Sequence, residues 1–339
     1  MSPFGQAMRG RNVFVTGAYG MLGGWLVRAL LDRGAHVVVL RRDQIRASLL
    51  DLDGLEASCA VVHGDLLDPG LLDRVIGEHE IDTVLHLAAQ TIVGTANRSA
   101  VPTFETNVRG TWLLMDACRQ HDVRRVVVAA SVQAYGGHGA LPYREDLALR
   151  PRFPYDVSKA ATDLIARSYW HTYGVPVAVT RLANVYGGGD LNRSRLLPEA
   201  IAAVLRGRAP AIRSDGSPER DFLYVEDAAD AYLAICDALD ADEGRRPGDE
   251  VVARGEAFNA GGGLPHSVRS VIDAVVRVSG VDLEPDVRGT GTPSHEIDRQ
   301  AVDASKLAAR TGWAPRVGLD EGIARTIAWY REHPGAIPT

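Results

Sequence analysis

The feature that most limits what this chain can fold into is a glycine-rich segment near its start, T-G-x-x-G-x-x-G at residues 16–23. An apolar run at residues 12–16 precedes it, and apolar residues at helical spacing follow it. A tight turn needs the conformational freedom of glycine, and a pyrophosphate needs close approach to the unpaired N–H groups of a helix N-terminus. The segment therefore predicts a strand, a phosphate-binding turn and a helix, in which a dinucleotide contacts Gly17, Tyr19, Gly20, Met21 and Gly23.

The rest of the first half alternates between strand-like and helix-like patterns. Apolar, β-branched runs at residues 36–40, 60–63, 83–87 and 125–130 are separated by helical patterns, of which the longest covers residues 103–121. Strands that alternate with helices indicate a parallel sheet covered on both faces and joined by right-handed connections. We therefore expect an α/β fold with a doubly wound parallel sheet, the Rossmann arrangement.

The alternation becomes less regular after residue 186, where a glycine-rich loop and a stretch rich in Pro, Gly, Ser and Asp interrupt it. We expect a dinucleotide-binding domain at residues 1–186, which carries the catalytic residues. A smaller C-terminal lobe at residues 187–339 is expected to bind the substrate. Strands near residues 175–182 and 257–259 are expected to return to the main sheet.

The composition narrows the function classes. The chain has 339 residues, of which 46% are hydrophobic and 24% charged, and its formal net charge is −6. This is a globular composition. The sequence has no basic block of the kind that neutralises a phosphate backbone, and no apolar run approaches the roughly 18 residues of a membrane helix. We therefore expect neither nucleic acid nor a membrane as a partner.

The cysteines and histidines favour a cytoplasmic protein without a metal site. Cys59, Cys118 and Cys236 are odd in number and far apart, which is typical of reduced thiols rather than of disulfides. The ten histidines show no metal-ligand spacing. Residues 1–11 contain no apolar stretch of the kind found in secretory signals. We expect a cytoplasmic location and no bound metal.

The end of the second predicted strand bears on the choice of dinucleotide. Arg41, Arg42 and Asp43 follow the run at residues 36–40. An acidic side chain here would bind the ribose hydroxyls of NAD, whereas two guanidinium groups can clamp the 2′-phosphate of NADP. We expect Arg41 and Arg42 to bind the cofactor and to favour NADP. NAD is the alternative, with Asp43 reaching the ribose and the arginines solvated at the surface.

The threonine-led spacing of the glycine turn differs from the G-x-G-x-x-G of most dinucleotide dehydrogenases, and it resembles the extended short-chain dehydrogenase/reductases. The resemblance covers residues 10–333. It implies further cofactor contacts after the third and fourth strands and on the next helix. These contacts are Asp65 and Leu66 at the adenine, Leu87, Ala88 and Ala89 along the cofactor, and Asn107, whose amide would brace the site.

Tyr155 and Lys159 form a Y-x-x-x-K pattern and would share one face of a helix, about one turn apart. A phenol has a pKa near 10, and a nearby ammonium group favours its ionised form. Tyr155 can then take a proton from a sugar hydroxyl while a hydride leaves the same carbon. Ser131 lies 24 residues earlier and matches the catalytic Ser/Thr of the family. We expect Ser131, Tyr155 and Lys159 to be catalytic, with Tyr155 and Lys159 also contacting the cofactor.

Later segments resemble members of this branch that act on nucleotide-diphosphate sugars, the sugar epimerase/dehydratase family. Residues 181–187 are similar to its R-x-x-N-x-x-G segment, and residues 220–227 are similar to its R-D-[YF]-x-x-V-x-D segment. Arg288 resembles a second arginine that binds the diphosphate. The resemblance implies a nucleotide-diphosphate sugar as substrate, and the residues expected to bind it are Gln90, Gln133, Asn184, Arg220 and Arg288.

Residues 187–192 and 294–297 are among the segments that look closest to the CDP-glucose 4,6-dehydratase-like group. Dehydratases of this kind eliminate water with an acid and a base placed directly after the catalytic Ser/Thr. This chain has Val132 and Gln133 at those positions, and neither side chain can do that chemistry. We therefore expect a nucleotide-sugar 4-epimerase, which oxidises C4 transiently and returns the hydride to the opposite face.

Other functions stay open from the sequence. A 4,6-dehydratase with relocated acid and base, or an NADPH-dependent 4-ketoreductase, would use the same fold. A non-catalytic NAD(P)-binding regulatory protein belongs to another class, and such proteins usually lack the Tyr/Lys pair. The helical patterns at residues 103–121 and 157–173 resemble those that form a four-helix interface in relatives, so we expect a homodimer.

Overall fold

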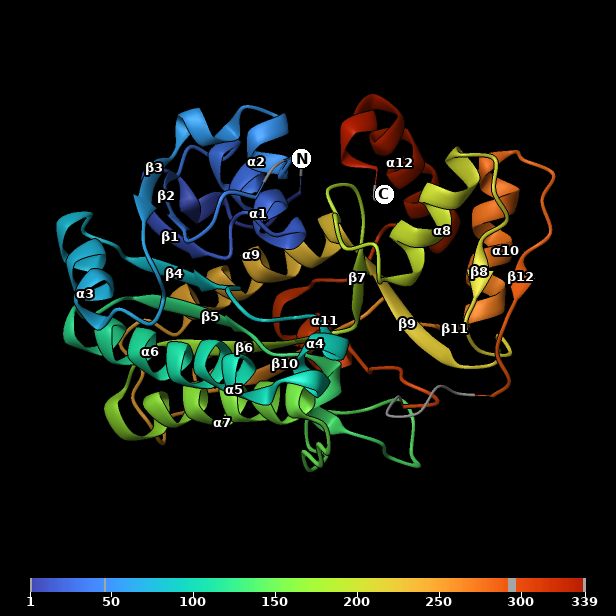
Figure 1. Ribbon diagram of the computed structural model, residues 1–339. Coiled ribbons are helices and arrows are strands. Elements are labelled where there is room, and N and C mark those ends of the chain that lie inside the picture. The colour runs from blue at the N-terminus through green and yellow to red at the C-terminus, as the bar shows by residue number, and fades with distance from the viewer. Residues whose placement is uncertain (1, 46, 292–296, 338–339) are drawn as a thin grey trace.

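Seven parallel strands form the main sheet in the computed structural model, which describes residues 2–45, 47–291 and 297–337 (Figure 1). Their order is β10-β6-β5-β4-β1-β2-β3, and every neighbouring pair is parallel. The predicted doubly wound α/β fold is confirmed. The strands are β1 (Asn12–Thr16), β2 (His36–Arg41), β3 (Ala60–His63), β4 (Thr83–His86), β5 (Arg125–Ala129), β6 (Val177–Leu182) and β10 (Ala257–Ala260).

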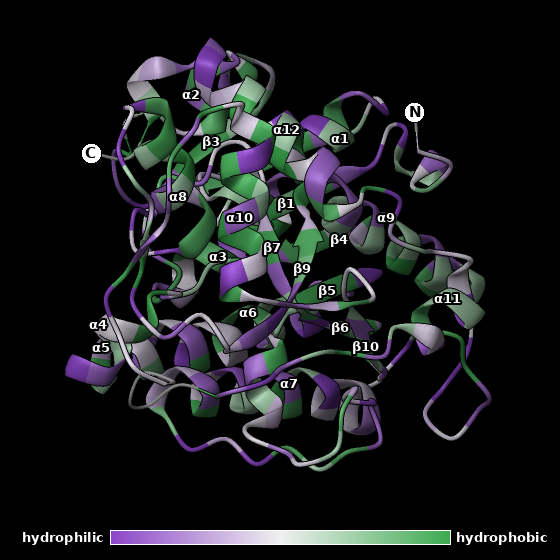
Figure 2. Ribbon diagram, turned by 90° about the vertical axis from the view of Figure 1, so that its right-hand side faces the viewer, coloured by the Kyte–Doolittle hydropathy of each residue, from purple (hydrophilic) through white to green (hydrophobic). Residues whose placement is uncertain are grey.

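Helices cover both faces of this sheet, and alternate residues of β1 enter the two cores between them. Val13 and Val15 pack in the core that includes side chains of the first set of helices, whereas Phe14 packs in the core of the second set. Figure 2 shows this arrangement as apolar central strands among helices with polar outer faces. The first set is α1 (Met21–Leu31), α9 (Val225–Ala241) and α11 (Ser305–Thr311), and the second is α3 (Pro69–Glu78), α6 (Gly110–Gln120) and α7 (Pro154–Tyr173).

A smaller group of elements continues from the carboxyl end of β6 and has its own apolar core, which includes Ile201, Val271 and Ile323. It contains a three-stranded sheet in the order β11-β9-β7 and a two-stranded pair, β12-β8. Figure 1 shows it beside the main sheet. Its elements are β7 (Asn184–Tyr186), α8 (Leu196–Leu205), β8 (Ala211–Ile212), β9 (Glu219–Tyr224), β11 (Pro265–Ser267), α10 (Val268–Ser279), β12 (Asp286–Val287) and α12 (Leu319–Glu332).

Two predicted details can be compared with this architecture. The segments near 175–182 and 257–259 do return to the main sheet, as β6 and β10. The pattern at residues 103–121 forms connected pieces rather than one α-helix: α5 (Ala100–Phe104), a π-helical turn (Glu105–Arg109) and α6. Hydroxyl groups of Thr111 and Thr162 donate to the Asn107 carbonyl in that turn. Of the segment at 294–297, only Ile297 lies within the described residues.

The remaining short elements connect these layers. In the described part of the chain, no helix is long and apolar enough to cross a membrane. Cys118 and Cys236 are buried free thiols, and Cys59 is a half-buried one. The short elements are α2 (Leu49–Leu52), α4 (Val93–Arg98) and the 3₁₀ turns Gln6–Met8, Leu55–Ser58, Val132–Tyr135 and Pro334–Ala336.

Candidate active site at the carboxyl edge of the sheet

The carboxyl ends of the main strands meet at one edge because all seven strands are parallel. There, β1, β4, β5 and β6 are followed directly by the glycine turn, by residues 87–90, by Ala130 and Ser131, and by Ala183 and Asn184. The strand order reverses between β1 and β4, which is where open α/β sheets bind ligands. The predicted cofactor and catalytic segments are therefore brought to one edge.

The glycine turn between β1 and α1 has no room for side chains. Gly17 has a φ of +76°, and a Cβ there would lie 2.7 Å from the backbone nitrogen of Ala88. A Cβ at Gly23 would overlap the Gly17 carbonyl oxygen, so this glycine lets α1 pack closely on the turn. Gly20 precedes α1, and no side chain caps the first amides of this helix. The turn thus fits a dinucleotide pyrophosphate, with Met21 as the first helical residue.

Arg41, at the end of β2, is already bonded to carboxylates. Its Nη1 donates to both carboxylate oxygens of Glu56, at 2.9 and 2.8 Å, and its Nη2 lies 3.9 Å from Asp51. The guanidinium also lies over the ring of Tyr19, whose hydroxyl donates to Glu56 at 2.7 Å. Burial and the nearby Glu56 carboxylate raise the pKa of Tyr19, which keeps its phenol protonated. Tyr19 and Arg41 therefore form a fixed wall beside the glycine turn.

Arg42, the second arginine of the predicted phosphate clamp, is exposed and pairs with its neighbour Asp43 at 2.7 Å. Together with the Arg41 cluster, two guanidinium groups face three carboxylates here. A 2′-phosphate is best held by an excess of positive charge. Around Arg41 and Arg42 the structure therefore lacks the excess of positive charge that would favour NADP.

His86, the last residue of β4, ties the central strands to the helices. Its Nδ1 lies 2.7 Å from the hydroxyl of Thr16, and its Nε2 lies 3.2 Å from the hydroxyl of Thr111. The same Thr16 hydroxyl accepts a hydrogen bond from the backbone of Ala88. Burial, assisted by the charge of Lys159, lowers the pKa of His86 to about 3, so its ring is neutral at pH 7.

The other residues predicted to line the cofactor follow β3 and β4. Asp65 is exposed, and its carboxylate accepts from the backbone N–H of Leu67 at 2.9 Å, whereas Leu66 is buried. Residues 87–90 are half-buried at the edge between β1 and β4. These positions lie at the same edge of the sheet as the glycine turn.

Asn107 holds the segment after β4 through the backbone of Gln90. Its side-chain oxygen accepts from the Gln90 N–H at 2.7 Å, and its amide nitrogen donates to the Gln90 carbonyl and to the Ser158 hydroxyl, at 3.1 and 2.9 Å. Both amide hydrogens are thereby used. Asn107 fixes the segment after β4 to α7, which is the bracing role that the sequence predicts for it.

Ser131, Tyr155 and Lys159 lie at the junction of β5 and α7, and each is at least nine-tenths buried. The Lys159 ammonium donates to the carbonyl of Ala129, the last residue of β5, at 2.7 Å. The Ser131 hydroxyl accepts from the N–H of Gln133 at 3.2 Å and so begins the 3₁₀ turn that follows. The predicted catalytic side chains therefore share one small region at the carboxyl edge of the sheet.

Opposing electrostatic effects act on the pKa of Tyr155, and burial acts on that of Lys159. Burial raises the pKa of Tyr155, while the charge of Arg195 and a hydrogen bond with Ser131 lower it. Burial lowers the pKa of Lys159 to about 8, so its ammonium form still predominates at pH 7. A positive group next to a phenol favours phenolate, which is the form that can act as a base.

A buried ion pair holds the catalytic turn against α7. Arg181 of β6 donates to both oxygens of Asp163 in α7, at 2.8 and 3.2 Å, and both side chains are almost fully buried. Its Nη1 also donates to the hydroxyl of Tyr135, which in turn donates to Asn259 of β10 at 2.8 Å. The arginine of the R-x-x-N segment is thus a structural residue that fixes the 3₁₀ turn after Ser131.

Three residues predicted to bind substrate are joined to the smaller lobe. Asn184 donates to the Asp221 carbonyl at 3.2 Å, and Nη1 of Arg220 donates to the Asp298 carbonyl at 2.9 Å. Gln133 exchanges two amide hydrogen bonds with Gln300, both 3.2 Å long.

The side chains of the other two predicted substrate residues, Gln90 and Arg288, each bond to a residue two positions away in the chain. Gln90 accepts from the N–H of Ile92 through its side chain at 2.8 Å. Arg288 is exposed, and its Nε donates to Asp286 at 2.7 Å. The predicted convergence of Arg288 with Arg220 on a diphosphate stays a prediction.

Sequence reasoning missed two charged residues near Tyr155. Arg195 precedes α8, bonds to Asp190 at 3.0 Å, and its charge acts on the Tyr155 phenol. Asp156 is 3% exposed, and burial raises the pKa of its carboxyl to about 7. Arg195 belongs to no pattern that would have marked it, whereas Asp156 carries one signal, a charged side chain directly after the tyrosine.

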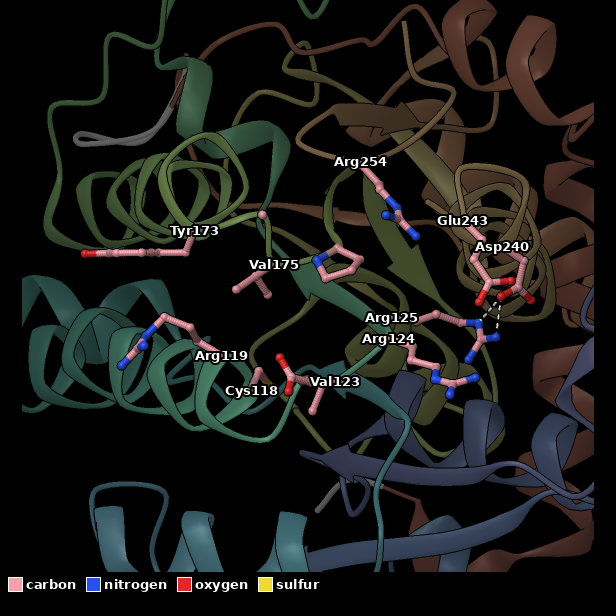
Figure 3. A pocket seen from close by; sticks show the side chains of 13 residues that line it. Cys118, Arg119, Val123, Arg124, Arg125, Tyr173, Val175, Asp240, Glu243 and Arg254 are labelled. Carbon is pink, nitrogen blue, oxygen red and sulfur yellow. Dashed lines mark hydrogen bonds and ion pairs between the residues drawn. The ribbon is translucent and has the colours of Figure 1, made fainter. Parts of the chain in front are cut away.

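A separate hollow lies at the opposite edge of the sheet, before β5 and β6 (Figure 3). Arg119, Arg124, Arg125 and Arg254 line it together with acidic side chains, and Arg125 is held by Asp240. It lies far along the strands from the glycine turn and Tyr155, so it is no part of the candidate active site. Among the described residues, no cluster of His, Cys, Asp or Glu has the arrangement of a metal site.

Comparison with known proteins agrees with this geometry. Residues 13–261 match the model of the NAD dependent epimerase/dehydratase family. A dTDP-glucose 4,6-dehydratase of Xanthomonas campestris is 32% identical over 337 residues, which cover 93% of this chain and 92% of the relative.

Solved structures give the same result. The UDP-glucose 4-epimerase of Thermotoga maritima, with UDP-glucose, superposes with a TM-score of 0.85 at 26% identity, covering 95% of this chain and 99% of that one. The dTDP-glucose 4,6-dehydratase of Streptomyces venezuelae, with NAD bound, gives 0.83 at 30% identity, covering 96% and 98%. The chain belongs to the NAD-dependent epimerase/dehydratase family, the extended short-chain dehydrogenase/reductases that act on nucleotide sugars.

Proposed function

We propose that this protein is a nucleotide-sugar 4-epimerase. The observation that carries the proposal is the pair of residues after Ser131. Val132 is buried and apolar, and the amide of Gln133 is bonded to Gln300. Neither side chain can protonate a leaving hydroxyl or remove a proton from C5 of a sugar. Of the side chains of this protein, proton transfer at the C4 hydroxyl needs only the Ser131, Tyr155 and Lys159 group, and a nicotinamide cofactor would supply the hydride acceptor.

In this proposal Tyr155 takes the proton of the C4 hydroxyl, and a bound nicotinamide cofactor supplies a reversible acceptor for the hydride of C4. Ser131 hydrogen-bonds the same sugar oxygen and shares its proton with Tyr155. Lys159, fixed by the Ala129 carbonyl, favours the phenolate and bonds the nicotinamide ribose. Once the 4-keto sugar has turned in the site, Tyr155 returns the proton to O4.

The proposed cofactor is NAD, held by the glycine turn, the Tyr19–Arg41 wall and the segment at residues 87–90. Glu56 and Asp51 beside Arg41 would repel a 2′-phosphate, and they leave no excess positive charge for it. The related dehydratase of Streptomyces venezuelae carries NAD. The preference for NADP that Arg41 and Arg42 indicate in the sequence is untested, and NADP is the competing candidate.

The proposed substrate is a nucleotide-diphosphate sugar that lies between the two parts of the chain. Residues 1–186 would hold the dinucleotide and the catalytic group, and residues 187–339 would mainly hold the nucleotide sugar. Asn184 and Arg220, on neighbouring strands of the small sheet, would contact the sugar and the diphosphate. The related epimerase of Thermotoga maritima was solved with UDP-glucose, which supports this class of substrate.

A 4,6-dehydratase is the second candidate, because the Xanthomonas campestris relative with 32% identity has that activity in its name. It would require an acid and a base in other positions. His138 and Glu145 are poorly placed for this role, since His138 is bonded to the Ala148 carbonyl and Glu145 accepts from the Asn259 N–H. These bonds support the epimerase over the dehydratase.

We also propose that two copies pair through α5, α6 and α7, in a cytoplasmic homodimer. Val101, Trp112 and Leu164 are exposed apolar side chains on these helices, which lie side by side in Figure 1. An exposed apolar patch on adjoining helices is typical of a protein interface. Light scattering should give twice the chain mass, and Leu164→Glu should give the single mass; a wild-type monomer would contradict the pairing.

Product analysis tests the proposed reaction. The NAD-loaded protein is incubated with UDP-, dTDP-, CDP- and GDP-glucose, and the products are separated by anion-exchange chromatography and weighed by mass spectrometry. An epimerase converts one of these substrates to an isomer of equal mass. A product lighter by one water would replace the proposal by the dehydratase, and turnover only with NADPH and a 4-keto sugar would replace it by a ketoreductase.

A further inference from the structure

A second pocket adjoins the candidate active site, with a volume of about 410 Å³. Three segments enclose it: the loop at residues 136–141, the beginning of α7 and residues 297–299. Its wall is mixed, because Leu141, Phe153 and Ile297 are apolar while other members are charged. A concave site with an apolar lining and a few polar groups is typical of small-molecule recognition.

Asp156 lines this pocket, and its side chain is unusual. It is 3% exposed, and within the described ranges its carboxylate has no hydrogen bond or ion pair to the protein, while its oxygens are not fully enclosed and keep contact with the pocket. Burying a carboxylate without a partner is costly, and it shifts the group toward its neutral form. A hydrogen-bond donor from a ligand in the pocket would supply the missing partner.

Several residues that line the pocket are chain neighbours of predicted catalytic and substrate residues. Asp156 directly follows Tyr155, and Gly136 directly follows the 3₁₀ turn that begins at Ser131. On the other side, Arg299 lies between Asp298, which accepts from Arg220, and Gln300, which is bonded to Gln133. The pocket therefore approaches Tyr155 through its neighbour in α7, Asp156.

The charged groups around Asp156 suit a neutral, hydroxylated ligand. Arg299 is paired with Glu219 at 2.7 Å, so it adds little net charge. Arg152 is exposed at the rim, and the ring nitrogen of His138 is bonded to the Ala148 carbonyl. A carboxylate acceptor, guanidinium donors and an aromatic ring such as Phe153 together match the hydroxyls and the apolar face of a sugar.

We propose that this pocket is a specificity subsite for the end of the sugar remote from the diphosphate, in which Asp156 accepts a hydrogen bond from a sugar hydroxyl. The inference rests on the proposed function, because it takes the substrate to be a nucleotide-diphosphate sugar. It adds a specificity-determining residue to the catalytic group and places it one residue after Tyr155.

A purely structural role predicts different behaviour. Asp156 lies in the first turn of α7, where a carboxylate stabilises the helix dipole. Under that reading, Asp156→Ala lowers the melting temperature. Under the proposal, it leaves the melting temperature of the ligand-free protein unchanged or raises it, because an unpartnered buried carboxylate is removed.

The test compares binding of a nucleoside diphosphate with binding of its sugar. Dissociation constants of UDP, dTDP, CDP and GDP and of the four corresponding glucose conjugates are measured by calorimetry on the NAD-loaded protein. For the pair that binds best, the tightening due to glucose is the dissociation constant of the nucleoside diphosphate divided by that of its glucose conjugate. Asp156→Ala should lower this ratio about tenfold and leave the dissociation constant of the diphosphate unchanged. Asp156→Asn, which keeps an acceptor oxygen, should lose less, and Asp146→Ala, at an exposed position nearby, should match wild type.

The outcomes separate the two proposals. If wild type neither binds nor converts any of the four glucose conjugates, the proposed function fails. If it converts one of them but binds it no more tightly than the nucleoside diphosphate, the subsite is wrong while the proposed function stands. The same conclusion follows if wild type binds a glucose conjugate more tightly but Asp156→Ala keeps the full tightening. A lowered melting temperature, equal weakening of diphosphate and glucose conjugate, or a loss of turnover with unchanged sugar binding would also overturn the subsite.

Discussion

The dinucleotide side of the candidate site and its sugar side are held together by different kinds of contact. On the dinucleotide side, the glycine turn is built from backbone atoms within residues 16–23, and a Cβ at Gly17 or Gly23 would collide with the backbone around it. On the sugar side, side chains far apart in sequence meet, as in the bonds of Gln133 with Gln300 and of Arg220 with Asp298. The first side is set by a short motif, whereas the second depends on how the smaller lobe packs.

The comparison predicts that chemistry, sugar binding and cofactor choice can be altered separately. The largest effect is expected for Tyr155→Phe, which removes the proposed base. Turnover should fall by 10²- to 10⁴-fold, while NAD binding stays within about threefold, because the cofactor is held mainly by the glycine turn. The measurement is steady-state turnover together with calorimetry, and Tyr173→Phe, at an exposed position, is the control. Near-normal turnover of Tyr155→Phe would remove the catalytic assignment.

Arg220→Ala should separate the two sides most clearly. Losing a guanidinium that bonds a diphosphate weakens binding of a nucleotide sugar by about 10- to 100-fold, and the affinity for NAD should not change. Arg288→Ala should have a smaller effect, because Arg288 is exposed and already paired with Asp286. Calorimetric titration of both variants checks this order. Equal losses for the sugar and for NAD in Arg220→Ala would mean that the two sides are not independent.

The cofactor wall can be tested through Glu56. Glu56→Gln removes a carboxylate bonded to Arg41 and frees that guanidinium for a 2′-phosphate, so the ratio of NADP to NAD affinity should rise about tenfold. Glu78→Gln, on the exposed surface of α3, should leave the ratio as in wild type. A wild-type protein that already prefers NADP would reinstate the clamp that the sequence indicates.

The smallest predicted effect is on stability against pH. His86 has a folded pKa of about 3, below the value of about 6.5 in the unfolded chain, so the unfolded state binds the extra proton as pH falls. The contribution of His86 to stability should therefore decline below pH 6.5, by about 1.4 kcal/mol at pH 5.5. Asp156, whose pKa is raised to about 7, has the opposite effect on stability. Its charged form is destabilising in the folded protein, so its contribution to stability falls as the pH rises above the pKa of about 4 that a carboxyl has in the unfolded chain.

The His86 contribution is isolated by His86→Gln, which keeps groups able to bond Thr16 and Thr111. Urea unfolding of this variant and of wild type is compared at pH 7.5 and 5.5. Relative to wild type, the variant should become more stable at pH 5.5 than at pH 7.5, by about 1 kcal/mol. An identical loss in both proteins would show that His86 titrates normally in the folded state.

The difference between the two sides also explains what the sequence could predict. The seven-stranded sheet follows from alternating apolar runs, and the turn at residues 16–23 and the Tyr155–Lys159 spacing are local patterns. The predicted phosphate clamp rests on two adjacent residues, Arg41 and Arg42, because nothing in the sequence shows that Glu56 folds back onto Arg41. The cofactor preference therefore depended on a contact across 15 residues.

On the sugar side, the motifs marked Arg181 and Arg220 but not their partners. Arg181 is neutralised by Asp163 on a different element, a pairing that no spacing rule predicts. Burial of Asp156 depends on the loop at 136–141 and on residues 297–299, more than a hundred positions later in the chain. Long-range packing of this kind decides whether a polar residue is exposed or functional, so the sequence alone could not reveal it.

The central claim is that Tyr155 moves the proton of the C4 hydroxyl while a bound nicotinamide would exchange the hydride of C4, and that no residue removes the proton at C5. The most direct test is turnover in D₂O, followed by mass spectrometry and proton NMR of the product. The account predicts an isomer of the starting nucleotide sugar, with no deuterium at C5 and no loss of mass as water. A product lighter by one water, with solvent deuterium incorporated into the sugar, would contradict the account and require an acid and a base that replace Val132 and Gln133.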